Sequence, residues 1–410
     1  MNEYVIIGNS IAAVGCVEGI RKYDKEGKIT ILSRENHKVY ARPLISYYLE
    51  KKTDLQRINY RSGSFYEDEK VELLLGESAA KIDTASKKVL TDSGKEIPYT
   101  KVCVATGSSP FVPPMEGLEN VEKKFSFMTI DDSLELEKTI DKTSRVLIVG
   151  AGLIGLKCAE GIKDLAGSIT VCDLADRVLS SILDAECAAF VQKGLEANGI
   201  EFFLSDSVAK FEANKAYMKS GKEVDFDVLV LAIGVRANIS LIKDIGGETN
   251  RGIVINEKSE TSIHDVYAAG DCAEGFDSSI GAKRVLALLP NAYMQGHAAG
   301  VNMAGGEEVF DKAIPMNSIG FFGTHIMTAG TYEGEMIEEK DDITLKRFFV
   351  KDNKLVGYML INDVGRAGIY TSLIREKVSL DTVDFELLKK VATTFAFSKE
   401  NRGKKFGGVV

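Results

Sequence analysis

Residues 146–162 read VLIVGAGLIGLKCAEGI, and residues 4–20 read YVIIGNSIAAVGCVEGI. In each stretch an apolar run of strand type ends at a glycine turn, and a segment with helical spacing of apolar residues follows. A short β-branched run comes after each helix-like segment. Strand, helix and strand in this order are typical of a βαβ unit. Because the copies lie too far apart for a solenoid repeat, the sequence predicts two nucleotide-binding units.

The glycine turns have the spacing of dinucleotide-binding turns. In that pattern the first glycine lets the chain reverse, the second lets the backbone approach a pyrophosphate, and the third lets the helix pack on the strand. The second copy carries the full pattern, with Gly150, Gly152, Ile154 and Gly155. The first copy is degraded, with Gly8, Ser10 and Ala13 at the three positions. One such pattern also fits an ordinary tight turn, but two copies in the same context predict dinucleotide binding.

The residue at the end of each second strand indicates which dinucleotide is bound. An acid there accepts hydrogen bonds from ribose hydroxyls and repels a 2′-phosphate. Asp173 takes this place in the second copy and is followed by Leu174, which favours NADH over NADPH although Arg177 lies nearby. In the first copy Glu35 is the nearest acid, either a ribose ligand or a solvated loop carboxylate. Arg34 beside it is a candidate to flank the adenine.

Composition excludes several other classes of function. The chain has 51 basic and 60 acidic residues, and its net charge of −9 argues against a general nucleic-acid binder. No apolar stretch approaches the roughly 20 residues that span a bilayer, and no basic leader precedes the first apolar run, so we expect a cytoplasmic protein. Six cysteines without a Cys-x-x-Cys pair and four histidines lead us to expect reduced, buried thiols and no metal site.

These features resemble the FAD- and NAD-dependent pyridine nucleotide–disulfide oxidoreductase superfamily. The most similar members are those without a redox disulfide, the rubredoxin, ferredoxin and nitrite reductase flavoproteins. The resemblance covers about residues 1–310, and further motifs follow in family order at residues 40–46, 104–107, 231–236 and 266–272. It implies an α/β fold with two Rossmann-like dinucleotide-binding domains, the NAD domain inserted in the FAD domain, and a C-terminal α/β domain that shields the flavin and docks partners.

The resemblance also implies which residues line the cofactors, FAD and NAD. Arg42 and Pro43 belong to the segment along the flavin pyrophosphate and ring, and Asp271 holds the ribityl chain. The helix that starts near Asn291 and Ala292 points at the pyrimidine edge of the flavin. The other candidates lie at the ends of apolar strands, where open α/β sheets place ligands. They are Ala105, Thr106, Gly107, Ile233, Gly234 and Gly270.

The domain boundaries follow from these motifs. We expect an FAD domain of residues 1–112 and 237–315, an NAD domain of residues 113–236, and a C-terminal domain of residues 316–410. Strand-like runs in the last of these lie at 318–322, 343–350 and 354–361, and a helix is expected in the segment that begins at Asp363.

The cysteines argue against a disulfide reductase. Members of that group carry a cysteine in the segment that is Tyr40 to Leu49 here, but no cysteine lies between Cys16 and Cys103. Cys272 is predicted to pack beside Asp271. We therefore expect NADH to reduce FAD and the electrons to pass to a small protein carrier, such as an iron–sulfur protein. No residue is predicted to be catalytic, because the cofactors carry the chemistry.

Two alternatives remain open at this point. One is an NADH oxidase, a thiol-linked peroxidase or a disulfide reductase, and the other is an NADH-sensing flavin-binding regulatory protein. We also consider a homodimer. The basic residues Lys399, Arg402, Lys404 and Lys405 either dock an acidic carrier or form a solvated tail.

The sequence departs from the family at two positions. Many relatives carry a lysine after the segment like residues 42–46, paired with a glutamate on the NAD helix. Tyr47 and Lys157 stand at these positions here. Because both members of the ion pair differ, we expect a different electrostatic setting for the flavin, unless Lys157 points to solvent.

Overall fold

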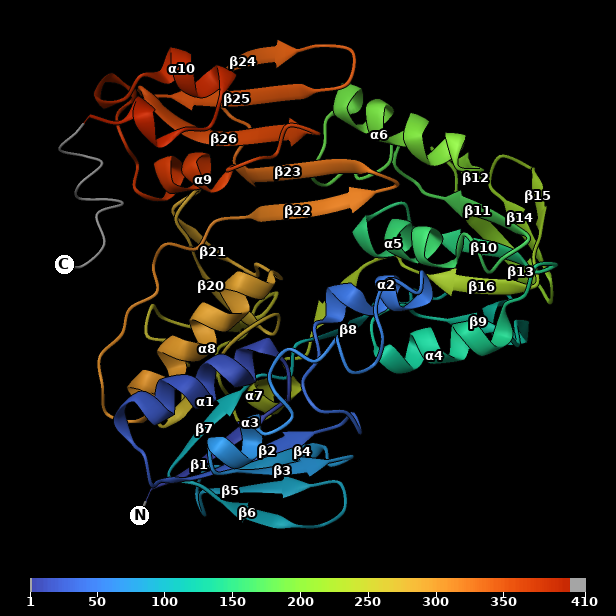
Figure 1. Ribbon diagram of the computed structural model, residues 1–410. Coiled ribbons are helices and arrows are strands. Elements are labelled where there is room, and N and C mark those ends of the chain that lie inside the picture. The colour runs from blue at the N-terminus through green and yellow to red at the C-terminus, as the bar shows by residue number, and fades with distance from the viewer. Residues whose placement is uncertain (1, 399–410) are drawn as a thin grey trace. The chain divides into compact units, whose positions relative to one another are not determined.

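The structure, a computed structural model, describes residues 2–398 (Figure 1). The basic residues from Lys399 onward, considered either to dock a carrier or to form a solvated tail, lie outside the described residues. The chain divides into two compact units. The first consists of residues 1–181, 195–276 and 283–311, and the second of residues 182–194, 277–282 and 312–410. The three expected domains and their boundaries stay a prediction.

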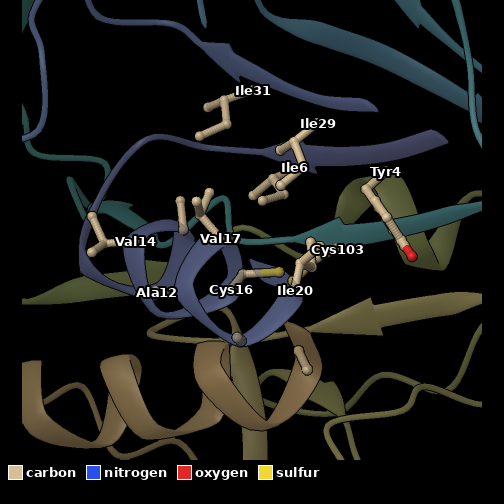
Figure 2. Close-up of a cluster of buried hydrophobic side chains, with 14 of the residues drawn as sticks. Tyr4, Ile6, Ala12, Val14, Cys16, Val17, Ile20, Ile29, Ile31 and Cys103 are labelled. Carbon is tan, nitrogen blue, oxygen red and sulfur yellow. The ribbon is translucent and has the colours of Figure 1, made fainter. Parts of the chain in front are cut away.

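The first glycine turn belongs to a parallel sheet of five strands in the order β19-β7-β1-β2-β3. Its strands are rich in β-branched residues, and the central ones are buried on both faces, as in other parallel sheets. The elements are β1 (Glu3–Ile7), α1 (Ile11–Tyr23), β2 (Lys28–Ser33), β3 (Val71–Leu75), β7 (Lys101–Val104) and β19 (Val266–Ala268). Figure 2 shows the core between α1 and these strands, where Val17 and Ile20 of α1 point toward Ile6 and Ile29.

Helix α8 (Leu289–Met303) lies side by side with α1 (Figure 1). A Cβ built on Gly15 lies 2.3 Å from the carbonyl oxygen of Tyr293, and one built on Gly296 lies 2.0 Å from that of Ala12. Gly19 and Gly300 repeat this contact one turn further along. The two helices therefore touch backbone to backbone, and no larger side chain fits at these positions.

The second glycine turn belongs to another five-stranded parallel sheet, in the order β12-β11-β10-β16-β9. Its elements are β9 (Lys124–Phe125), α4 (Ile130–Thr139), β10 (Arg145–Val149), α5 (Leu153–Ile162), β11 (Ser168–Cys172), α6 (Ala185–Ala197), β12 (Ile200–Phe203) and β16 (Val228–Leu231). An antiparallel sheet of β13 (Val208–Glu212), β14 (Lys215–Met218) and β15 (Glu223–Asp225) packs beside it.

Short segments join the two parallel sheets within the first unit. β8 (Ser108–Pro110) and β17 (Val235–Ala237) pair antiparallel directly after Gly107 and Gly234. The chain therefore leaves one sheet and returns to it along the same ladder. The remaining elements of this unit are η1 (Arg42–Leu44), α2 (Ile45–Leu49), α3 (Phe65–Asp68), β4 (Ala79–Asp83), β5 (Lys88–Thr91), β6 (Glu96–Pro98), η2 (Leu118–Asn120), α7 (Ser240–Lys243), β18 (Ile253–Val254), most of β20 (Ala273–Asp277) and most of β21 (Ala282–Arg284).

The second unit contains an antiparallel sheet in the order β22-β23-β26-β25-β24. Its strands are β22 (Met316–Phe321), β23 (Thr324–Gly330), β24 (Glu335–Lys340), β25 (Leu345–Lys351) and β26 (Lys354–Ile361). Helix α9 (Gly368–Arg375) covers β26, and η3 (Leu380–Thr382), α10 (Phe385–Lys390) and η4 (Thr394–Ala396) follow. The sequence pattern predicted three of the five strands. It missed β23 and the edge strand β24, whose polar run EMIEEK has no clear apolar alternation.

Residues 185–194 of α6 belong to this second unit, and ion pairs hold the first turn of the helix there. The side chain of Arg347 on β25 is only 6% exposed and forms ion pairs with Asp184, Glu186 and Glu338. A single buried guanidinium thus joins the first turn of α6 to strands β24 and β25. No helix within residues 2–398 has both the length and the apolar character needed to cross a membrane.

Candidate functional site

The two glycine turns have the same geometry at the carboxyl ends of the two parallel sheets. Gly8 has φ +115° and Gly150 has φ +118°, a region that favours glycine. A Cβ built on Gly8 lies 2.1 Å from the carbonyl oxygen of Ala105, and one on Gly150 lies 2.2 Å from that of Ala232. Each turn therefore requires glycine for two reasons. Its φ is unfavourable for other residues, and a side chain would collide with the backbone that follows β7 or β16.

The glycines of the second turn differ in whether the protein itself requires them to be small. A Cβ built on Gly155 lies 2.0 Å from the carbonyl oxygen of Gly150, so packing within the protein requires this glycine. A Cβ built on Gly152 meets no protein atom within 4 Å. Since nothing in the protein needs Gly152 to be small, the open space beside it fits a pyrophosphate, as the pattern predicts.

The first turns of both helices leave N–H groups for an anion. Gly152 stands at the N-cap of α5 and has no side chain to cap it. Ser10 stands at the N-cap of α1, but its hydroxyl accepts no capping hydrogen bond. Serine at this position usually caps the helix. The helix starts are therefore free to bind phosphate oxygens at both turns.

Asp173 follows β11 and holds the second turn in shape. Its Oδ2 accepts a hydrogen bond of 2.6 Å from the backbone N–H of Ala151, and its Oδ1 accepts one of 2.8 Å from that of Ala175. Carboxylate oxygens have further lone pairs, so these bonds are compatible with a ribose ligand. Leu174 beside it is 70% exposed, and Arg177 pairs with Asp176 at 2.7 Å. The role of Asp173 toward the ribose stays a prediction.

On the flavin side, Glu35 and Arg42 form an ion pair. The hydroxyl of Tyr40 donates to Glu35 at 2.7 Å and accepts from Arg42 at 3.1 Å. Arg42 also donates to the carbonyl oxygen of Met128 at 3.1 Å. Both carboxylate oxygens of Glu35 thus have partners in the protein, which sequence reasoning did not foresee. Arg34, the candidate to flank the adenine, is exposed.

Three of the predicted flavin motifs come together around Gly270. A Cβ built on this residue lies 3.1 Å from the Cβ of Ala12 on α1 and 3.6 Å from that of Ala292 on α8. Its N–H donates to Oε1 of Gln295 at 3.0 Å, so Gln295 is a site residue that the sequence motifs missed. The starts of α1 and α8 and the end of β19 therefore meet at one point.

Asp271, predicted to hold the ribityl chain, lies in the same place. Burial raises the pKa of its carboxyl, while the nearby Arg42 guanidinium and a hydrogen bond with Ser108 act in the opposite direction. Arg42 thus lies within electrostatic range of both Glu35 and Asp271. A partly buried carboxylate beside an arginine suits a ligand with hydroxyl groups, which donate hydrogen bonds to it.

Asn238, which the sequence motifs did not single out, fixes the two segments that join the parallel sheets. Its Nδ2 donates to the carbonyl oxygen of Thr106 at 2.8 Å, and its N–H donates to that of Gly107 at 3.0 Å. The hydroxyl of Thr106 donates back to the carbonyl oxygen of Asn238 at 3.0 Å. Asn238 directly follows β17, the strand on which the chain returns to the first sheet, and this position is the sequence signal that could have identified it. Just before β17, Ile233 is 36% exposed, and a Cβ built on Gly234 meets open space.

The thiols lie in the interior. All six cysteines belong to the described residues, and all are free and buried. The sulfur of Cys272 lies 3.3 Å from the carbonyl oxygen of Val104, and burial raises its pKa to about 11. A thiol with such a pKa is not a nucleophile at neutral pH, in agreement with a packing role. Residues 2–398 contain no cluster of three or more His, Cys, Asp or Glu side chains suited to a metal ion.

Comparisons with known proteins extend these observations. The chain is 29% identical to the NADH-dependent phenylglyoxylate dehydrogenase subunit epsilon of Aromatoleum evansii, over 92% of each chain. It is 34% identical to an NADH oxidase of Methanocaldococcus jannaschii, over 75% of this chain and 71% of the relative. It spans only 48% of another relative, the nitrite reductase [NAD(P)H] of Bacillus subtilis, to which it is 29% identical over 92% of its own length.

Solved structures agree on the fold. The structure of the covalent putidaredoxin reductase–putidaredoxin complex superimposes with a TM-score of 0.88 and 22% identity, and covers 96% of this chain and 97% of that chain. This confirms the predicted α/β fold. The family model described as pyridine nucleotide-disulphide oxidoreductase matches residues 2–296. It confirms the predicted enzyme class, an FAD-dependent NAD(P)H oxidoreductase, and the predicted cofactors are those of the family. The chain belongs to the pyridine nucleotide-disulphide oxidoreductase family.

Proposed function

We propose that this chain is an FAD-dependent NADH oxidoreductase that passes electrons to a small iron–sulfur carrier protein. One observation carries the proposal: two glycine turns, each at the carboxyl edge of its own parallel sheet, lie in one compact unit whose thiols are all buried. Two dinucleotide sites suit electron transfer between two cofactors. Without an accessible thiolate, the thiol-linked peroxidase and disulfide reductase alternatives lose their nucleophile.

The residues of the chain bind and orient the cofactors, while FAD, when bound, takes up a hydride and releases electrons. The turn at Gly150 with Asp173 holds the pyridine nucleotide, and the exposed Leu174 beside the acid favours NADH over NADPH. Arg42, Asp271 and the start of α8 hold FAD. No side chain needs to move a proton for this chemistry. The predicted cofactor-binding residues are proposed in these roles.

Relatives support a protein carrier as acceptor. Those that are named for one include an NADH-rubredoxin oxidoreductase of Clostridium acetobutylicum, 26% identical, and a rubredoxin-NAD(+) reductase of Pseudomonas putida, 28% identical. We place the activity in the cytoplasm, where free thiols stay reduced. A homodimer is a further prediction, which size-exclusion chromatography with light scattering tests.

A second candidate function is that of an NADH oxidase. It is favoured by the 34% identity to the relative of that name. In that case oxygen takes the electrons directly, and no carrier is needed. The regulatory alternative has no comparable observation in its favour.

Anaerobic stopped-flow spectroscopy separates these functions. The yellow protein is mixed with NADH, and then with oxidised rubredoxin, oxidised ferredoxin or oxygen. We expect NADH to bleach the flavin and a carrier to reoxidise it faster than oxygen does. Fast reoxidation by oxygen alone favours the oxidase. A flavin that NADH leaves oxidised contradicts every catalytic function considered.

A further inference from the structure

Helices α2 and α5 meet between the two predicted cofactor sites. α2 begins three residues after Arg42, and α5 begins directly after Gly152. The two helices pack against each other within the first unit (Figure 1). The contact is close, since a Cβ built on Gly161 of α5 lies 3.2 Å from the carbonyl oxygen of Ser46 on α2. The junction therefore joins the two helices that directly follow segments assigned to the flavin and to the pyridine nucleotide.

A buried ion pair lies at this junction. The side chain of Lys157 is 13% exposed, and that of its ion-pair partner Glu160 is 5% exposed, so Lys157 does not point to solvent. The ammonium of Lys157 lies 4.5 Å from the centre of the Tyr47 ring on α2, within cation–π range. Lys52 lies 5.6 Å from the same ring, but it is 60% exposed and pairs with Glu50. Of these two ammonium groups next to Tyr47, that of Lys157 is the more deeply buried.

The order of the two charges along α5 is opposite to what a helix favours. An isolated helix is stabilised by acids near its N-terminus and bases near its C-terminus, and a glutamate before a lysine is the better order. Here Lys157 precedes Glu160 in a helix that runs from Leu153 to Ile162. Helix stability therefore gives no reason for this arrangement. Along the helix, the base Lys157 stands one turn nearer to the glycine turn than the acid Glu160 does.

We propose that Lys157, held by Glu160 and Tyr47, is a positioning residue that adds positive potential at the cofactor edge. This inference rests on the proposed function. The field of the pair adds to that of the α5 N-terminus, and both favour negative charge at that edge. It thereby stabilises the bound pyridine nucleotide through its pyrophosphate, and it favours the reduced flavin, which carries more negative charge than the oxidised form. Tyr47 keeps the ammonium in place from the flavin side.

The test compares the purified holoenzyme with the neutral variant Lys157→Gln/Glu160→Gln. The double variant leaves no unpaired buried charge, and glutamine has a size similar to that of glutamate and can form hydrogen bonds, so we expect the melting temperature to change little. We expect the two-electron midpoint potential of the flavin, measured by dye equilibration, to fall by up to about 20 mV, the equivalent of a fivefold change in the equilibrium constant. The Kd for NAD⁺, measured by fluorescence titration, should rise about two- to fivefold.

Two controls make the result specific. Lys52→Gln/Glu50→Gln removes the exposed pair beside the same ring and should leave the potential unchanged. Lys157→Arg keeps the charge and should keep the potential. The proposal is overturned by an unchanged potential and Kd in a folded neutral variant, by an equal shift in the Lys52 control, or by an equal fall in Lys157→Arg. Dye equilibration uses a chemical reductant, so it stays informative if NADH fails to reduce the flavin, which instead refutes the proposed function.

Discussion

Gly152→Ala separates the effect on ligand binding from the effect on packing. The added methyl group meets no protein atom within 4 Å, and the residue has φ −84° and ψ −173°, which alanine adopts without strain. Replacing glycine reduces the entropy of the unfolded chain, which stabilises by about 0.4–1 kcal/mol. The loss of an N-cap glycine costs a similar small amount. The free energy of unfolding should therefore change by less than about 0.5 kcal/mol.

The same methyl group occupies the space assigned to the pyrophosphate. We expect the Kd for NAD⁺ to rise at least tenfold, or about 1.4 kcal/mol, while FAD content stays at the wild-type level. Titration of the holoenzyme with NAD⁺ and thermal unfolding measure the two effects. Gly155→Ala is the matched control, because its methyl group lies 2.0 Å from the carbonyl oxygen of Gly150 and should destabilise the fold. Wild-type affinity in Gly152→Ala refutes the assignment of this turn.

Three further substitutions test separate parts of the argument. Asp173→Ala should raise the KM for NADH, and the double variant with Leu174→Arg should shift the preference toward NADPH. Steady-state kinetics with both nucleotides measure these changes. Unchanged KM values contradict the role of the acid. Burial raises the pKa of the Asp271 carboxyl above its ordinary 3.8, so the folded apoprotein binds this proton more tightly than the unfolded chain does. The stabilisation that results is complete below pH 3.8 and is lost as the pH rises through the raised pKa. Asp271→Asn should remove this loss in denaturant unfolding as the pH is raised above 3.8. It should also weaken FAD binding, and an unaltered pH profile argues against this electrostatic setting. Arg347→Met leaves Asp184, Glu186 and Glu338 without their common partner. Because these carboxylates are 36%, 53% and 25% exposed and can be hydrated, the second unit should be destabilised by about 1–3 kcal/mol. Calorimetry that shows no loss contradicts the importance of this cluster.

The local pattern was enough to predict both parallel sheets. An apolar run, a glycine turn and an apolar helix face depend on residues close together in the sequence, and both copies fold as expected. The strands of the second unit were harder to predict. β24 is an edge strand with polar residues, and the alternation that marks a half-buried strand is weak there.

The candidate site likewise contains residues that a local pattern predicts and residues that it does not. The glycines were found because a tight turn and a close approach restrict residue type at fixed spacing. Asn238 and Gln295 were missed, since each works by a hydrogen bond to backbone far away in the sequence. The partners of Glu35 were likewise hidden, although Tyr40 and Arg42 stand only a few residues away.

Spacing and residue type alone predicted two dinucleotide-binding turns, and the sequence shows that no cysteine lies between Cys16 and Cys103. The direction of Lys157, toward Tyr47 and away from solvent, required the packing of α2 on α5. The burial of every thiol required the folded core. The physical reason is that backbone turns are local, whereas burial and charge pairing depend on which distant segments fold against each other.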